Sequence, residues 1–344
     1  MMPARITTAT PERIPELSSF LRDVFQFPPD APSFRPDLMH WKYFEPHPWW
    51  PDGRSYILEN QGVIAAHGCI TPVRFLSKGR SVESAQVIDW AASGAAPGGG
   101  VVIYRYCLSL LGTLLAIGGS EITQRLIPTV RWFRKRCDMN LYARPLHALR
   151  YFAVSPHRSA RTVLKVTRNF AWSLSPRLPD TSQWRCTPVP DFERVSTPSD
   201  SFIAIQRTAE WLNYFLRCPA SHFQALVLSD GGQWHGYALL SFVGPQARIV
   251  DFAIDSADAK EWLGALSAVI RWVALQPGVG EIAGGSSLDF FQRLYTAAGM
   301  RLRTSWPVYL ADPKGCISQD AELEINFLIG DASFLCVRND SLWC

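Results

Sequence analysis

Four short landmarks recur in the same order in the two halves of the 344-residue chain. They are a Tyr-Phe-x-x-x-Pro pattern, a His-Gly pair, an apolar strand carrying Asp-aromatic-Ala, and a Gly-Gly-Ser run. In the first half they begin at Tyr43, His67, Val87 and Gly118, and in the second half at Tyr214, His235, Ile249 and Gly284. The offsets between partners stay between 162 and 171 residues. This order predicts a duplicated unit, with chance matches as the alternative.

The residues around the landmarks predict the same succession of elements in each half. Two short apolar runs flank a turn, at 55–59 and 63–70 in the first half and at 225–229 and 234–240 in the second. A third strand then carries the Asp landmark. A helix, a strand, a second helix and a final strand follow, at 101–111, 114–117, 123–137 and 141–143, and again at 259–275, 281–283, 288–298 and 305–311. We therefore expect an α/β (α+β) fold with a mixed central sheet flanked by helices in each half.

The stretch between residues 155 and 201 is rich in Pro, Ser and Thr, which indicates a linker. The predicted organisation is an N-terminal domain at 1–155, a linker at 156–200, and a C-terminal domain with an extension at 201–344. Two domains agree with a typical length of about 150 residues for each.

Composition excludes several classes of protein. Hydrophobic residues make up 47% and charged residues 19%, so the chain is not disordered. A net charge of +4 is too small to indicate a nucleic acid or an anionic membrane as partner. The eight cysteines form no CxxC pair, so we expect reduced thiols, a cytoplasmic protein and no metal site. The longest apolar run, 107–119, is too short for a membrane span.

A glycine-rich run, Ala-Ala-Pro-Gly-Gly-Gly at 95–100, follows the third strand and precedes a helix. With the duplicated unit, this run resembles the GNAT-type acyltransferase superfamily in its tandem form, over roughly residues 40–150 and 205–311. The acyl-CoA motif of that family is Arg or Gln, two residues, Gly, one residue, and Gly or Ala. Gly98 and Gly100 match it, whereas Ala95 replaces the Arg or Gln. The resemblance implies acetyl-CoA or another acyl-CoA as co-substrate, and a flexible linker is the alternative interpretation.

The resemblance also implies which residues contact the co-substrate. An irregular strand offers a backbone N–H to the thioester oxygen, and the start of the helix binds the pyrophosphate. The corresponding positions are Trp90, Ala91, Ala92, Ser93, Gly98, Gly99, Gly100 and Val101. The matching stretch of the second half, 255–259, carries two carboxylates and no glycine. We therefore expect acyl-CoA in the first half.

Asp89 and Tyr295 are the candidate catalytic residues. Asp89 stands on the strand before the loop and could act as a base, directly or through water. Because Asp251 repeats it in the half without the loop, a structural role is the alternative. Tyr295 lies four residues before Gly299, where the resemblance implies a phenol that protonates the leaving thiolate. The equivalent residue of the first half is Phe133.

Two further groups are candidates for ligand contact. Ser120 and Glu121 follow the fourth strand and are expected to bind substrate, with helix capping as the alternative for Ser120. Arg131 and the basic run at 134–136 fall on the expected second helix. They could approach the phosphates of CoA, or form a solvated helix face.

The resulting expectation is an N-acyltransferase that acts on a small-molecule amine, such as an amino sugar or amino acid of a cell-envelope or polysaccharide pathway. No nucleic-acid partner is expected, and the oligomeric state is not predicted. Two alternatives remain. One is a non-catalytic binding module, which the division of motifs between the halves would explain. The other is a Fem-type transferase that uses aminoacyl-tRNA, for which a more basic surface is expected.

Overall fold

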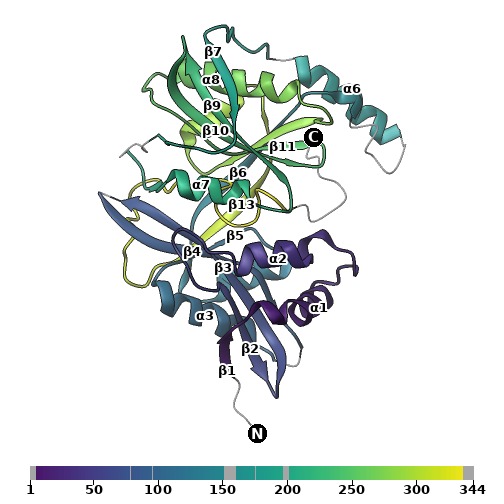
Figure 1. Ribbon diagram of the computed structural model, residues 1–344, viewed down its shortest axis with the longest axis vertical. Helices are drawn as coiled ribbons and strands as arrows, with labels where there is room; N and C mark the ends of the chain where they lie inside the picture. The colour runs from purple at the N-terminus through teal and green to yellow at the C-terminus, as the bar shows by residue number, and fades with distance from the viewer. Residues whose placement is uncertain are drawn as a thin grey trace.

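In the computed structural model, which describes residues 5–77, 79–94, 96–150, 160–174, 176–196 and 201–335, one continuous mixed sheet runs through the molecule (Figure 1). Its strand order is β1-β2-β3-β4-β5-β13-β6-β12-β11-β10-β9-β7, and β8 pairs with β3 beside it. The short edge strands are β1 (Arg5–Thr8), β7 (Trp184–Val189) and β8 (Ala204–Ile205). Helices pack on both faces of the sheet.

After strand β1, the first half has two helices and then the predicted succession of strands and helices. Its helices are α1 (Ile14–Phe25), α2 (Pro36–Tyr43), α3 (Gly99–Leu111) and α4 (Glu121–Leu126). Its strands are β2 (Ser55–Asn60), β3 (Val63–Ser77), β4 (Arg80–Ala92), β5 (Leu114–Ile117) and β6 (Phe133–Pro145).

The second half repeats this order of elements. Its helices are α7 (Ala209–Leu216), α8 (Ala259–Ala274) and α9 (Asp289–Ala297). Its strands are β9 (His222–Asp230), β10 (Gln233–Val243), β11 (Gln246–Ile254), β12 (Glu281–Ser286) and β13 (Arg301–Ala311). The stretch 156–200, expected as a linker, contains helix α6 (Ala160–Leu174) and strand β7, which joins the sheet next to β9.

The final strands of the two halves are exchanged. Strand β13 of the second half lies between β5 and β6, both of the first half, and is antiparallel to each. Strand β6 of the first half lies between β13 and β12, both of the second half. Each half therefore completes its sheet with a strand from the other half, and Figure 1 shows β6 and β13 crossing the middle of the molecule.

The helix expected at 123–137 is wrong. Helix α4 ends at Leu126, a single 3₁₀ turn (Ile127–Thr129) follows, and strand β6 begins at Phe133. Pro128 lacks a backbone N–H and disfavours continuation of the helix. The basic residues at 134–136 therefore lie on a strand and not on the expected helix. In the second half, the strand expected at 281–283 continues through the Gly-Gly-Ser run, which forms the last three residues of β12.

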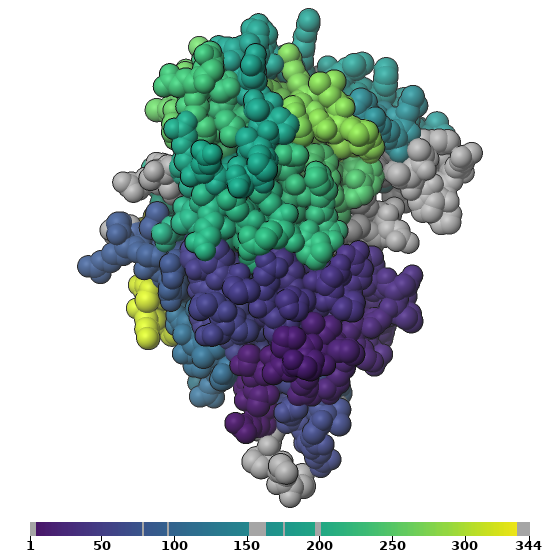
Figure 2. Space-filling model, viewed as in Figure 1, coloured from purple at the N-terminus to yellow at the C-terminus, as the bar shows by residue number. Residues whose placement is uncertain are grey.

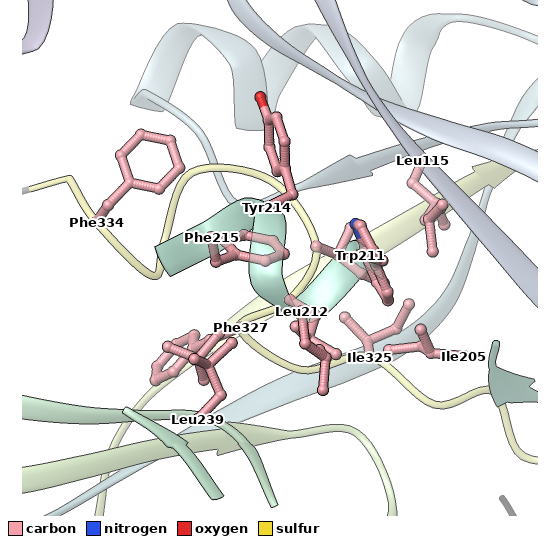
Figure 3. Packing of buried hydrophobic residues seen from close by; sticks show 14 of the residues in the cluster. Leu115, Ile205, Trp211, Leu212, Tyr214, Phe215, Leu239, Ile325, Phe327 and Phe334 are labelled. Atoms are coloured by element: carbon pink, nitrogen blue, oxygen red, sulfur yellow. The ribbon is translucent and has the colours of Figure 1, made fainter. Parts of the chain in front are cut away.

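The two halves share a core. Helix α7 contributes Trp211, Tyr214 and Phe215 to a buried cluster that also contains Trp41 of α2 and Phe327 near the C-terminus. Figure 3 shows the side chains of α7 between strands of both halves, and Figure 2 shows the halves in contact across the visible face. Burial of this many aromatic rings stabilises the association of the halves.

A buried arginine adds polar contacts to this boundary. Arg54, only 1% exposed, donates to the carbonyl oxygens of Trp41, Lys42 and Glu45 at 2.6–3.1 Å. It also donates to the hydroxyl of Tyr214 at 2.8 Å, and that hydroxyl donates to the Trp41 carbonyl at 2.8 Å. The guanidinium group thereby joins the end of α2 to α7 of the other half.

Replacement of Arg54 should therefore destabilise the whole protein. Arg54→Ala leaves several buried carbonyl oxygens without a donor, and we expect a loss of about 3–5 kcal/mol in the free energy of unfolding. Tyr214→Phe removes one hydroxyl and should cost about 1–2 kcal/mol. Urea unfolding followed by tryptophan fluorescence measures both changes. Equal losses in the two variants would contradict the role assigned to Arg54.

Candidate active site

Strand β4 is irregular at Asp89, the residue of the third landmark. The register between β3 and β4 shifts between His67 and Cys69, which marks a β-bulge. Asp89 has a φ of 48°, in the left-handed region that non-glycine residues rarely adopt. Such a conformation persists only where neighbouring groups hold it.

Those neighbours are Lys42, Tyr43 and His67. The Lys42 Nζ and the Tyr43 hydroxyl each donate to Asp89 Oδ2 at 2.6 Å. The His67 Nδ1 lies 2.8 Å from the Asp89 carbonyl oxygen, and its Nε2 lies 2.9 Å from the Ser55 hydroxyl. The side chains of Lys42 and Asp89 are 1% and 7% exposed. These contacts support the structural interpretation of Asp89, since they use its carboxylate to fix the bulge.

The protonation states at the bulge follow from these contacts. Burial raises the pKa of Asp89, but the charge of Lys42 and the hydrogen bonds from Lys42 and Tyr43 outweigh burial, so the pKa lies below its ordinary value. Burial lowers the pKa of His67 to about 4, so its imidazole is neutral at neutral pH. Lys42 and Asp89 therefore form a buried ion pair.

The glycine-rich loop leads directly into helix α3. Gly98 is the N-cap residue, with a φ of 81°, and no side chain caps the helix. A Cβ atom at Gly99 would lie 3.1 Å from the Ala66 Cβ, and one at Gly100 would lie 2.7 Å from the indole nitrogen of Trp90. Close packing therefore requires the glycines at 99 and 100, while the backbone N–H groups of the first turn receive no bond from a side-chain cap.

The other residues expected to contact acyl-CoA lie beside this helix start. The Trp90 indole nitrogen donates to the Gly100 carbonyl at 2.8 Å, so the ring fixes the first turn of α3. Ala91 and Ala92 pair with β3. The N–H of Ser93 donates to the Ala65 carbonyl at 2.9 Å, so it is already engaged. Val101 stands in the first turn and is partly exposed.

The corresponding helix start in the second half is occupied by its own side chains. The Asp258 carboxylate accepts from the Lys260 N–H at 2.9 Å and caps α8. The Ser256 hydroxyl accepts from the Asp258 N–H at 3.0 Å. An acidic cap competes with an anion for the same N–H groups and repels it. The two halves therefore differ in how the first turn of this helix is capped.

Ser120 and Glu121 lie at the start of α4. The Ser120 hydroxyl accepts from the Thr123 N–H at 3.3 Å, which is the geometry of an N-cap. Glu121 is 89% exposed and lies 3.5 Å from the Arg125 guanidinium. These contacts are those of residues that begin a helix. Binding of substrate by Ser120 and Glu121 stays a prediction.

Tyr295 lies in the second half, at a split between two parallel strands. Strands β11 and β12 pair from Gln246↔Glu281 to Ile249↔Gly284 and then separate, which we name the second split. A small cavity of about 10 Å³, with room for about one water molecule, lies at the split and is lined by Tyr295, Ser286 and Asn326 among others. A Cβ at Gly284 would lie 3.0 Å from the Tyr295 hydroxyl, so glycine admits the phenol. Burial raises the pKa of Tyr295 above its ordinary value.

Two carboxylates line the same cavity, those of Asp251 and Glu324, and one arginine pairs with both. Arg207 forms ion pairs with Asp251 at 2.7 Å and with Glu324 at 2.5 Å, and all three side chains are at most 5% exposed. The Tyr237 hydroxyl and the Asn326 amide also donate to Asp251, at 2.6 Å and 3.0 Å. Asp251 is thus held by a cation, as Asp89 is in the first half. The cluster of Asp251, Glu324 and Arg207 carries a net negative charge.

The C-terminal segment 323–335, which the sequence did not indicate as part of a site, passes both halves. In the first half β4 and β5 share one ladder pair, Gln86↔Leu115, and their separation beyond it is the first split. Gly330 lies against the side-chain amide of Gln86, so closely that a Cβ atom at this position would clash with it. The next residue, Asp331, is close enough to Asp89 and Lys42 for their charges to act on it.

Asp331 is the functional candidate that the sequence missed. Burial raises its pKa to about 6, the negative charge of Asp89 adds to the rise, and Lys42 opposes it. A carboxyl group with this pKa exchanges a proton near neutral pH. Only the fold brings residue 331 to β4, so no local pattern could have identified it.

The described segments hold no group of three or more His, Cys, Asp or Glu side chains placed to bind a metal ion.

Comparison with known proteins identifies the fold. No protein-family model and no curated protein matches this sequence. Among solved structures, it is similar to the Saccharomyces cerevisiae N-myristoyltransferase with bound myristoyl-CoA, at TM-score 0.61 and 12% identity over 91% of this chain and 83% of that chain. It is also similar to a GCN5-related N-acetyltransferase from Anabaena variabilis, at TM-score 0.56 and 11% identity over 90% and 72%. A proposed acetyltransferase from Pyrococcus horikoshii gives TM-score 0.54 and 15% identity over 97% and 96%. The chain has the GNAT fold, which confirms the predicted fold class.

The ion pair at the bulge should make stability depend on pH. Asp89→Asn leaves the Lys42 ammonium buried without its counter-ion, so we expect a loss of about 3–5 kcal/mol at neutral pH. Because the pKa of Asp89 is lower in the folded state, the pair stabilises fully above the unfolded pKa of about 4 and less as pH falls through the folded pKa. The difference between wild type and variant should therefore shrink in acid.

Urea unfolding at neutral and acidic pH measures this difference. Asp37→Asn, which breaks the exposed pair between Arg35 and Asp37, is the matched control and should change stability by at most about 1 kcal/mol. An Asp89→Asn effect that is the same at both pH values would contradict the role assigned to the ion pair.

Proposed function

We propose that this chain is an acyl-CoA-dependent N-acyltransferase that binds its acyl donor in the first half. The observation that carries the proposal is the start of α3, where no side chain caps the helix and where a glycine-rich loop follows an irregular strand. The GNAT fold supports the same activity, since the similar proteins include N-acetyltransferases and an N-myristoyltransferase with bound myristoyl-CoA.

The backbone N–H groups of Gly98, Gly100 and Val101 would bind the pyrophosphate of the donor, whereas the Gly99 N–H already donates to the Ala96 carbonyl at 2.9 Å. They lie at the positive end of the α3 dipole, and uncapped N–H groups at a helix start favour an anion. The equivalent place in the second half is capped by Asp258, so it disfavours a diphosphate. Bound acyl-CoA would supply the thioester carbonyl that the acceptor amine attacks.

The acceptor that we propose is a small primary amine, such as an amino sugar or amino acid. The net negative charge of the cluster formed by Asp251, Glu324 and Arg207 favours an ammonium group over a carboxylate beside the second split. The C-terminal segment contributes Glu324 to this cluster and Asp331 to the first split. An amine that enters between the halves would thus meet acidic groups from both.

An acceptor amine must lose a proton before or during attack, and Asp331 is the group that we propose as the base. Its pKa of about 6 leaves it ionised at neutral pH yet basic enough to accept a proton in the transition state. Asp89 is less suitable because its carboxylate already accepts from Lys42 and Tyr43. Tyr295 lies at the second split, where its protonated phenol lines the small cavity.

A carboxylate placed at the start of α3 tests the donor site. Val101→Asp adds a negative charge in the first helical turn, which stabilises the helix dipole but repels a diphosphate. We expect the affinity for acetyl-CoA, measured by calorimetry, to fall at least about tenfold. Val101→Thr, which adds no charge, should retain binding. Absence of heat from the folded wild type with acetyl-CoA and with longer acyl-CoAs would contradict the donor site.

Replacement of Asp331 tests the base. Asp331→Asn should lower kcat about 10²- to 10⁴-fold with little change in acetyl-CoA affinity. In the wild type, kcat/KM should rise with pH up to about 6 and then level, and this rise should be absent in the variant. Asp320→Asn, an exposed residue nearby in sequence, is the control. Release of the CoA thiol against a panel of amines provides the assay.

The same assay separates the proposed enzyme from a binding module. Acetyl-CoA binding without thiol release, for every amine in the panel, would favour a non-catalytic module over a transferase. An unchanged pH profile in Asp331→Asn would contradict the role of Asp331 as the base without contradicting the proposed donor site.

A further inference from the structure

Helix α6 is attached to the second half through its polar side. Figure 1 shows it at the periphery of that half. Asn169 is only 1% exposed. The indole ring of Trp172 lies under the guanidinium groups of Arg168, Arg301 and Arg303, at 4.2–4.8 Å from the ring centroid. Arg144 of β6 donates to the Ser173 carbonyl at 3.1 Å. The helix therefore uses polar and cationic contacts to pack against the protein.

The opposite side of α6 is apolar and exposed. Eleven large apolar side chains are exposed in the described part of the chain, and four of them lie on this helix. They are Val163 (54%), Leu164 (71%), Phe170 (60%) and Leu174 (65%). At 100° per residue they share one side of the helix, away from Asn169. A helix on a globular protein normally buries its apolar face, so the orientation of α6 is reversed.

All the Asp, Glu, Lys and Arg positions in the sequence around α6 are occupied by Lys or Arg. Residues 139–179 contain no Asp or Glu and seven Lys or Arg residues, namely Arg144, Arg150, Arg158, Arg161, Lys165, Arg168 and Arg177. The net charge of the whole chain is only +4, so the residues outside 139–179 carry a small net negative charge. The charge of the whole chain therefore does not reveal this basic segment. Arg168 is on the helix beside Leu164, and Arg301 and Arg303 of β13 add two charges beside Trp172.

An exposed apolar stripe bordered by cations fits an anionic lipid surface. Interfacial helices place their apolar face among the acyl chains and their Lys and Arg residues among the headgroups. No helix in the described ranges is long and apolar enough to cross a bilayer, and the 15 residues of α6 span roughly 22 Å, which suits a helix lying in the interface. A second copy of the chain would bring two basic segments together, and their repulsion opposes such a dimer.

We propose that α6 docks this protein onto anionic membrane surfaces. Val163, Leu164, Phe170 and Leu174 enter the interface between headgroups and acyl chains, and the positive charge of segment 139–179 attracts the lipid phosphates. Each cation near an anionic surface strengthens the attraction, and salt weakens it. The site is on the outside of the second half, and the proposal is independent of the acyltransferase activity.

Vesicle flotation of the full chain tests this proposal. Vesicles of phosphatidylcholine with phosphatidylglycerol should carry the protein at low salt, and vesicles of phosphatidylcholine alone should carry much less. High salt should release it. The double variant Leu164→Gln and Phe170→Gln removes apolar contact without adding charge, and its partition should fall about tenfold or more.

Val63→Gln is the matched control, since Val63 is 65% exposed at a hairpin of the first half. It should bind vesicles like the wild type. Circular dichroism and unfolding midpoints should be unchanged in both variants, because all three side chains are exposed. The proposal would be overturned if the wild type did not float with vesicles, or if the double variant floated equally well. It would also be overturned if the wild type bound no vesicles but self-associated, and the double variant abolished this self-association.

Discussion

The pairing of β6 with β13 is the interaction on which the rest of this structure depends. The two strands come from different halves and share ten paired residues. Each also pairs with a strand of the other half, β13 with β5 and β6 with β12. We call the paired strands β6 and β13 the seam. The parallel strands that border the two splits both pair with this seam, so displacement of either central strand would disturb both splits.

The two halves share a plan but differ in charge. The first offers an uncapped helix start, whereas the second caps its equivalent helix with Asp258 and surrounds Asp251 with acidic and cationic side chains. An anion and an ammonium group are thus favoured on opposite sides of the seam. The segment 323–335 contacts both halves, since Asn326 donates to Asp251 of the second half and Gly330 lies against Gln86 of the first. Its polar groups couple sites that the strands hold apart.

Periodicity and turn residues predicted the elements that are locally determined, such as the β2–β3 hairpin, α3 and α8. The expected helix at 123–137 failed because Pro128 interrupts it and strand β6 begins at Phe133. The exchange of β6 and β13 could not be predicted, since either strand could pair within its own half. The contacts of Asp89 with Lys42, and the approach of Asp331, join residues far apart in sequence. Helix α6 was missed because Pro, Ser and Thr around it indicated a linker.

The strand exchange also determines the order in which this protein can form during synthesis. Strand β6 leaves the ribosome more than 150 residues before β13. Until then β5 and β6 each present an unpaired edge, and such edges are sites of misassociation between chains. The nascent first half therefore exposes these edges while the second half is made, and the centre of the sheet closes only after β13 has emerged.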